Sequence, residues 1–99
     1  MARELYRLAG VNGYVMNVQA DLLASFATTV VVPILPAEEI SQPMARLNPT
    51  FEIDGRPYVM VTQAIAAVAR RDLGEAVGLV GEDRHSDLTQ ALDLLFSGF

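Results

Sequence analysis

The sequence predicts a small β-barrel or α+β domain, in which several short strands precede one C-terminal helix. Short apolar runs separated by turn residues fill residues 4–62, as expected for strands. Apolar side chains over residues 88–95 instead recur at helical spacing. The length of 99 residues suits one modest core, so we expect residues 1–99 to form a single domain.

The first predicted elements are two paired strands. Residues 4–8 and 14–19 alternate between apolar and polar side chains, and Asn12-Gly13 lies between them. Asn-Gly is a strong hairpin signal because both positions accept a positive φ. Alternation in the second strand places side chains on opposite faces, with Tyr14, Met16 and Val18 on one and Val15, Asn17 and Gln19 on the other.

A loop or bulge is predicted next, because Leu22 and Leu23 precede the small-residue segment ASFATT. Two adjacent leucines in a loop cannot both point easily into a core, so we expect one of them to be exposed. The β-branched run VVVPIL at 30–35 then predicts a buried strand. Because Pro33 has no N–H to donate, we expect it at a sheet edge or a bulge. Pro36 and Pro43 limit any following helix to a turn or two.

Two alternating apolar runs over residues 50–62 flank Asp54-Gly55 and predict a second hairpin. Residues 63–77 are ambiguous, since their alanines favour a helix while a strand continuing from the hairpin stays possible. The final helix is predicted from the stripe Leu88, Ala91, Leu92 and Leu95, with Asp83 or Ser86 as N-cap. Its opposite face carries Asp87, Gln90, Asp93 and Ser97.

Composition argues for a protein partner. The net charge is −5, and all seven cationic side chains are arginines, so clustered positive charge for nucleic-acid phosphates is lacking. An acidic protein more readily meets a basic patch on another protein. The chain has no cysteine, which fits a reducing cytoplasm. No apolar run approaches the roughly 18–20 residues that span a membrane, so we expect no membrane partner.

No set of residues points to catalysis. The single histidine, His85, lies near the predicted helix start, where a solvated or capping role is more common than a catalytic one. The carboxylate pairs Glu38-Glu39 and Glu82-Asp83 are most simply solubilising. We therefore expect a binding module that is not an enzyme and uses no cofactor or metal.

Five segments in order resemble the CcdB family, the plasmid and chromosomal toxins of CcdA–CcdB toxin–antitoxin pairs. They are VQADLL (18–23), VVVPIL (30–35), LNPTFEIDGRPYVMVT (47–62), LGEAVGLVGEDR (73–84) and LTQALDLLFSGF (88–99). The resemblance implies a small Src-homology-3-like antiparallel β-barrel with an additional small sheet and a long C-terminal helix. It also implies that residues 63–77 are largely extended, and that two copies form a symmetric homodimer with their C-terminal ends side by side.

The resemblance also implies a function. Such toxins bind the A subunit of DNA gyrase, a topoisomerase, and trap it on cleaved DNA, so that the toxin shifts a population of gyrase states without catalysis of its own. CcdA reverses this through its flexible C-terminal segment. The role expected here is therefore gyrase inhibition and plasmid maintenance, in the cytoplasm and under the control of a CcdA-like antitoxin, with no direct nucleic-acid binding by the toxin alone.

Gyrase-binding positions carry over from the resemblance one by one. The family's apolar pair falls on Leu22 and Leu23, a small polar contact falls on Ala20, and polar helix contacts fall on Gln90 and Asp93. The family's terminal Trp-Gly-Ile becomes Ser97, Gly98 and Phe99. Gly98 matches and Phe99 stays apolar, but Ser97 lacks the ring that stacks on a gyrase arginine, a contact worth about 1–2 kcal/mol.

That departure leaves two alternatives open. One is a CcdB-fold protein that no longer poisons gyrase, acting as a decoy for the antitoxin or as a toxin with another target. The other is a ribonuclease like the MazF toxins, which share the fold. A ribonuclease needs a basic RNA groove and an acid–base set, and the net charge of −5 argues against it.

Overall fold

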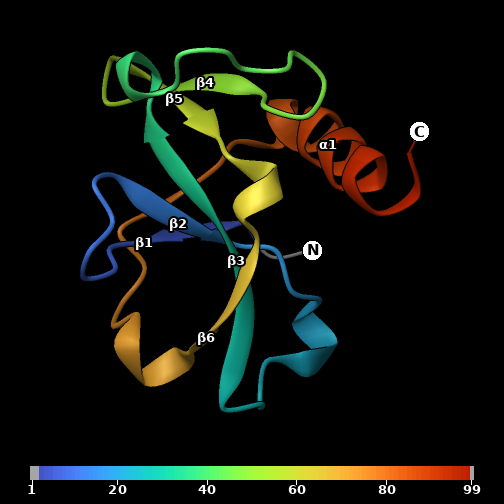
Figure 1. The fold of residues 1–99 in the computed structure, drawn as a ribbon. Helices are drawn as coiled ribbons and strands as arrows, with labels where there is room; N and C mark the ends of the chain where they lie inside the picture. The colour runs from blue at the N-terminus through green and yellow to red at the C-terminus, as the bar shows by residue number, and fades with distance from the viewer. Residues whose placement is uncertain (1–2, 99) are drawn as a thin grey trace.

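The computed structural model describes residues 3–98. Its strands are β1 (Glu4–Tyr6), β2 (Tyr14–Asn17), β3 (Thr28–Pro36), β4 (Thr50–Ile53), β5 (Arg56–Met60), β6 (Ala66–Ala69) and β7 (Gly78–Leu79). The helix α1 spans His85–Ser97. Five short 3₁₀ turns connect these elements, η1 (Asp21–Leu23), η2 (Ala37–Glu39), η3 (Thr62–Ala64), η4 (Arg70–Asp72) and η5 (Glu82–Arg84) (Figure 1).

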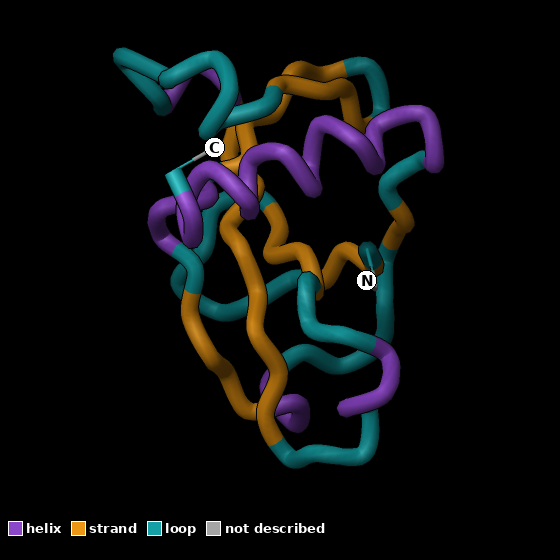
Figure 2. The backbone as a smooth tube through the Cα atoms, turned by 90° about the vertical axis from the view of Figure 1, so that its right-hand side faces the viewer, coloured by secondary structure: helices purple, strands orange, loops and turns teal. Residues whose placement is uncertain are grey.

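The strands form one antiparallel sheet in the order β4-β5-β3-β2-β1-β7, and β6 joins it by pairing with β3. Figures 1 and 2 show that the sheet curls and that α1 crosses it on one side. The predicted α+β fold with a C-terminal helix is therefore confirmed. The additional small sheet is not separate within residues 3–98, because the nine-residue β3 is long enough to serve both parts.

Pro33 lies in the middle of the central strand, so the predicted sheet edge is wrong, whereas the alternative of an irregularity in the pairing agrees with the interruption between β5 and β6 at this residue. On one side β3 pairs with β2 continuously, and on the other it pairs with β6 near its start and with β5 near its end. The Val61 N–H donates to the Pro33 carbonyl at 2.9 Å. The missing N–H of Pro33 therefore faces the gap between β5 and β6, where no strand requires a donor.

Both faces of the sheet are buried at β2, and its alternating side chains point to opposite faces, as predicted. Tyr14 and Met16 belong to a large core that includes Leu88 and Ala91 of α1. Val15 points the other way, into a smaller core with Val31 and Leu73. Burial on both sides explains how a short, seven-stranded sheet is stabilised.

Residues 63–77 contain no α-helix, and the extended path implied by the family resemblance is confirmed for β6, which lies between the 3₁₀ turns η3 and η4. Ala66 to Ala69 form β6, whose register places Ala66 opposite Val31 and Ala69 opposite Thr28. Helix propensity is a weak preference of a few tenths of a kcal/mol per residue. The hydrogen bonds offered by the first half of β3 outweigh it.

The helix α1 buries Leu88 and Ala91 completely, and Leu92 packs at the margin of the core, which confirms the predicted stripe. The predicted N-caps, Asp83 and Ser86, are wrong. The N-cap is Arg84, without a side-chain capping bond, because the η5 turn runs directly into the helix.

Gly13 is held in a close approach that we expect only glycine to tolerate. Its φ is +130°, and a Cβ would lie far inside the contact distance of the Ile34 carbonyl oxygen. Gly13→Ala is expected to lower the free energy of unfolding by about 3 kcal/mol, as measured by urea denaturation. Gly10→Ala is the control, because Gly10 also has a positive φ but nothing within 4 Å, and about 1 kcal/mol is expected there. Equal losses would contradict the steric explanation.

Asn48 ties the 40–49 loop to the sheet. Its buried Nδ2 donates to the Met60 carbonyl at 3.0 Å and to Gln63 Oε1 at 2.7 Å, and its Oδ1 accepts from the Met44 N–H at 3.0 Å. Asn48→Ala is expected to cost about 2–3 kcal/mol, because buried groups lose their partners. The exposed Asn12→Ala should cost under about 1 kcal/mol in the same denaturation series. A small loss at both positions would refute the role assigned to Asn48.

Candidate functional site

The first predicted site segment is the η1 turn after β2. Leu22 at its centre is 91% exposed, whereas Leu23 is half-buried. The Leu23 N–H donates to the Ala20 carbonyl at 3.0 Å, so Ala20 forms the exposed start of the turn. The prediction that one leucine of the pair is exposed is confirmed, and that residue is Leu22.

The turn is rigidly braced from its own loop. Gln19 Nε2 donates to the carbonyls of Leu23 and Thr28, each at 3.3 Å. From a distant segment, Arg70 Nε donates to the Phe26 carbonyl at 2.8 Å. Leu22 is therefore presented to solvent on an ordered support.

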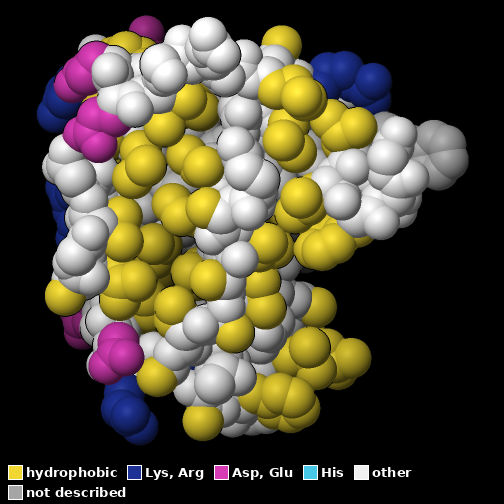
Figure 3. Space-filling view, viewed as in Figure 1, with side chains coloured by type: hydrophobic (Ala, Val, Ile, Leu, Met, Phe, Trp, Pro, Cys, Tyr) yellow, Lys and Arg dark blue, Asp and Glu magenta, His cyan; other side chains and the backbone are white. Residues whose placement is uncertain are grey.

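Phe26 is a site residue that the sequence analysis missed. Its side chain is 57% exposed, four positions after Leu22. An aromatic residue within the small-residue segment ASFATT was the available signal. Hydrophobic side chains gather at this lower end of the molecule in Figure 3. We call Leu22 and Phe26 the loop patch.

The second predicted segment is the outer face and the end of α1. Gln90, Asp93 and Ser97 are all exposed there. Gly98 adopts a left-handed conformation with φ 79°, and its N–H donates to the Leu94 carbonyl, which ends the helix. Phe99 lies outside the described residues.

Phe96 was also missed by the sequence analysis. Its side chain is 69% exposed, next to the polar face of α1. It lies at the margin of the apolar stripe, four positions after Leu92, on the side of the stripe next to Asp93. The end of the helix therefore carries an exposed ring one position before Ser97.

The two predicted segments do not meet within one chain. Figure 1 shows the η1 turn at the lower right and the C-terminal end of α1 at the upper right, well apart. Leu22 and Leu23 therefore form one surface, and Gln90, Asp93, Ser97 and Gly98 form another.

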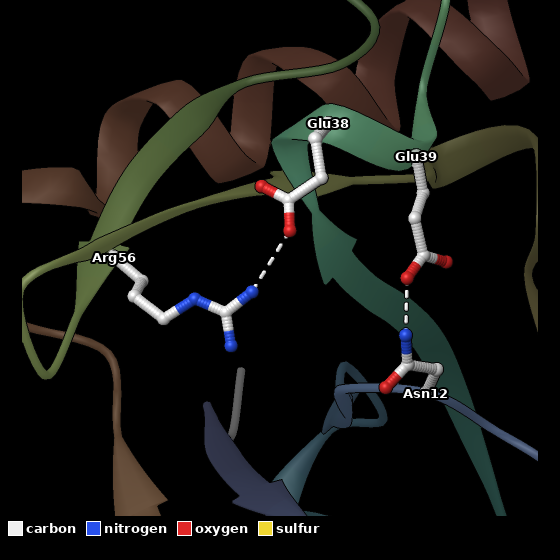
Figure 4. A network of polar contacts seen from close by, with 4 residues as sticks. All are labelled: Asn12, Glu38, Glu39 and Arg56. Atoms are coloured by element: carbon white, nitrogen blue, oxygen red, sulfur yellow. Dashed lines mark hydrogen bonds and ion pairs between the residues drawn. The ribbon is translucent and has the colours of Figure 1, made fainter.

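The carboxylate pair Glu38-Glu39 has a structural role. Glu38 Oε1 lies 2.9 Å from the Arg56 guanidinium, and Glu39 accepts a hydrogen bond from Asn12 (Figure 4). The η2 turn thus links the two hairpin tips. Both partners of the Glu38–Arg56 pair are exposed, so its contribution to stability is under about 1 kcal/mol.

Two side chains are relevant to acid–base chemistry, His85 and Tyr6. His85 is half-buried at the start of α1. Burial raises the pKa of the Tyr6 hydroxyl and the charge of Glu4 raises it further, so Tyr6 is no base near neutral pH. No group of three or more metal-ligating side chains occurs among residues 3–98. Nor does any helix in this part of the chain have the length and apolar character to cross a membrane.

Solved structures share this fold. The chain superimposes on "Mtb toxin" with a TM-score of 0.76 and 14% identity, covering 93% of this chain and 99% of that one. It superimposes on the toxin MazF-mt6 of Mycobacterium tuberculosis with a TM-score of 0.77 and 14% identity, covering 97% of this chain and 96% of that one. It also superimposes on an endoribonuclease in complex with its cognate antitoxin from a mycobacterial species. The TM-score is 0.75 and the identity 16%, covering 94% of this chain and 90% of that one. At these identities the likeness shows the fold alone.

The sequence itself identifies the family. No curated protein sequence matches the chain. The family model described as "CcdB protein" matches residues 4–98, nearly the whole chain. The chain therefore belongs to the CcdB family of toxin–antitoxin toxins.

Proposed function

We propose that the protein is the toxin of a toxin–antitoxin pair that binds the A subunit of DNA gyrase and traps it on cleaved DNA. It acts in the cytoplasm as a homodimer, without catalysis of its own, and a CcdA-like antitoxin neutralises it. The exposure of Leu22 is the observation that carries the proposal. The family resemblance assigns a gyrase-binding role to this position, and Leu22 is 91% exposed.

Burial of that side chain provides a driving force. Covering one leucine contributes about 1.5–3 kcal/mol, and a dimer presents two copies. Phe26 enlarges the same apolar surface. Because the turn is braced by Gln19 and Arg70, little ordering free energy opposes binding.

A homodimer with its C-terminal ends side by side would join the helix-end segments of two copies into one surface and leave the η1 turn of each copy apart from it. A two-fold axis near the C-terminal ends would place Gln90, Asp93, Ser97 and Gly98 of both copies around one exposed surface beside the dimer seam. Exposed Phe96 supplies apolar area for such a seam. The curled sheet would then correspond to the Src-homology-3-like barrel expected for the family.

The loop patch provides the first test. Purified protein, gyrase from the same host, ATP and supercoiled plasmid are expected to give linear DNA after detergent and protease. Leu22→Asp should lower the yield at least tenfold, because a buried carboxylate opposes the contact (about 2 kcal/mol or more). Met44→Asp is the matched control, since Met44 is also exposed but lies in another loop. Absence of linear DNA with micromolar wild-type protein would contradict gyrase poisoning and favour a decoy or another target.

Position 97 provides the second test. Ser97→Trp is expected to lower the half-maximal protein concentration for cleavage about tenfold, since a cation–π contact that is desolvated on binding contributes up to about 2 kcal/mol. Ser97 is exposed, so the substitution should leave the fold intact. Thr89→Trp, on another exposed position of α1, should leave the concentration unchanged. An equal gain from both substitutions would argue against a specific site.

One observation favours a second candidate. Solved structures with this fold are named as an endoribonuclease and as toxin MazF-mt6. A ribonuclease of this kind would cleave single-stranded RNA in the absence of gyrase. The variant His85→Ala would then show whether the one histidine is needed for that cleavage. The acidic charge of the chain makes gyrase binding the better-supported proposal.

A further inference from the structure

A cavity of about 760 Å³ opens between the two edges of the curled sheet. One wall is the β4 strand with Thr50 to Asp54, and the other is the segment from Val77 to Gly81 that contains β7. These strands are the first and last in the sheet order. The cavity therefore lies where a closed barrel would have continued its hydrogen bonding.

The β4 edge has unpaired main-chain groups. The register places Ile53 opposite Arg56 and Glu52 opposite Pro57. In an antiparallel pair, alternate residues turn their N–H and C=O groups outward, and here these are Thr50 and Glu52. Arg84 donates to the Thr50 carbonyl at 2.7 Å, which agrees with this orientation and occupies that end. Glu52 remains free to pair.

The β7 edge also turns main-chain groups away from its neighbouring strand. The N–H groups of Val77 and Val80 donate to the Leu5 and Arg3 carbonyls at 2.8 and 3.2 Å. Leu79, between them, turns its own main chain away from β1. Its side chain is 70% exposed, and exposed apolar side chains on an edge strand favour pairing with another chain.

The charge around the cavity is negative. Its lining contains three carboxylates, Glu52, Asp54 and Asp83, and one cationic side chain, Arg84. The Arg84 guanidinium is already engaged by the Thr50 carbonyl and by Asp87 at 3.2 Å. Apolar groups of Leu5, Tyr14, Phe51 and Val80 contribute to the lining.

We propose that this cavity docks an extended, positively charged segment of a partner protein. The segment adds to the β4 edge through main-chain bonds to Glu52. Its basic side chains face Glu52, Asp54 and Asp83, and an apolar side chain packs beside Leu79. Strand addition supplies affinity through the main chain, whereas the carboxylates select the charge. This docking surface is distinct from the loop patch and does not depend on gyrase binding.

Selection of random dodecapeptides on the full-length protein tests the proposal without a known partner. The enriched peptides are expected to carry arginine or lysine at alternating positions with β-branched or aromatic residues between them. In ¹H–¹⁵N NMR spectra, the best synthetic peptide should shift the amide signals of residues 50–54 and 77–84. Acidic peptides, no enrichment, or shifts confined to residues 20–27 or to α1 would overturn the proposal.

Substitutions then test the charge selection. Glu52→Gln and Asp83→Asn should each raise the Kd of that peptide about fivefold, as expected for loss of an exposed ion pair. Glu75→Gln is the matched control, because Glu75 is exposed but does not line the cavity. All three positions are exposed, so the fold should be retained, which the NMR spectra report directly. Equal Kd values for all variants would refute the role of the carboxylates.

Discussion

The two-sided pairing of β3 is the constraint on which the rest of the structure depends. This strand keeps β2 along one side and divides the other between β5 and β6, with Pro33 facing the gap. Because β5 pairs with the end of β3 and β6 with its start, the segments next to these pairings lie at opposite ends of the molecule. The β4–β5 hairpin and α1 lie at one end, and the loop patch lies at the other (Figure 1). The separation of the two candidate surfaces is thus a consequence of one long strand.

Local chemistry made much of this fold predictable. The turn at Asp54-Gly55 fixes one hairpin through its backbone conformation, since Asp54 and Gly55 both have positive φ. The first hairpin closes through a longer loop over residues 7–13, in which Gly10 and Gly13 have positive φ but Asn12 does not. The stripe beginning at Leu88 fixes the helix face. The β6 strand could not be predicted from its alanines, because its stability comes from the distant strand β3. The N-cap was missed for a related reason, since the path of η5 depends on tertiary contacts of Arg84.

Among the exposed apolar residues of the candidate site, the sequence predicted only those whose exposure follows from a local pattern. Adjacent leucines in a loop forced one of them outward, and Leu22 is that residue. Phe26 and Phe96 were missed because an isolated aromatic residue gives no sign of which way it points. Their exposure is decided by the placement of the loop and by helix rotation. The cavity between β4 and β7 depends on how far the sheet curls, which no local pattern encodes.

The pairing of β1 with β7 has a consequence for synthesis of the protein. Leu5 lies opposite Gly78, so the first strand finds its last neighbour only after nearly the whole chain exists. Contacts of such long range slow folding, and a growing chain exposes Leu5 and Met16 until β7 and α1 arrive. The ribosome must therefore release most of the chain before a stable, active conformation forms. An incompletely translated copy would be a target for proteolysis rather than a functional fragment.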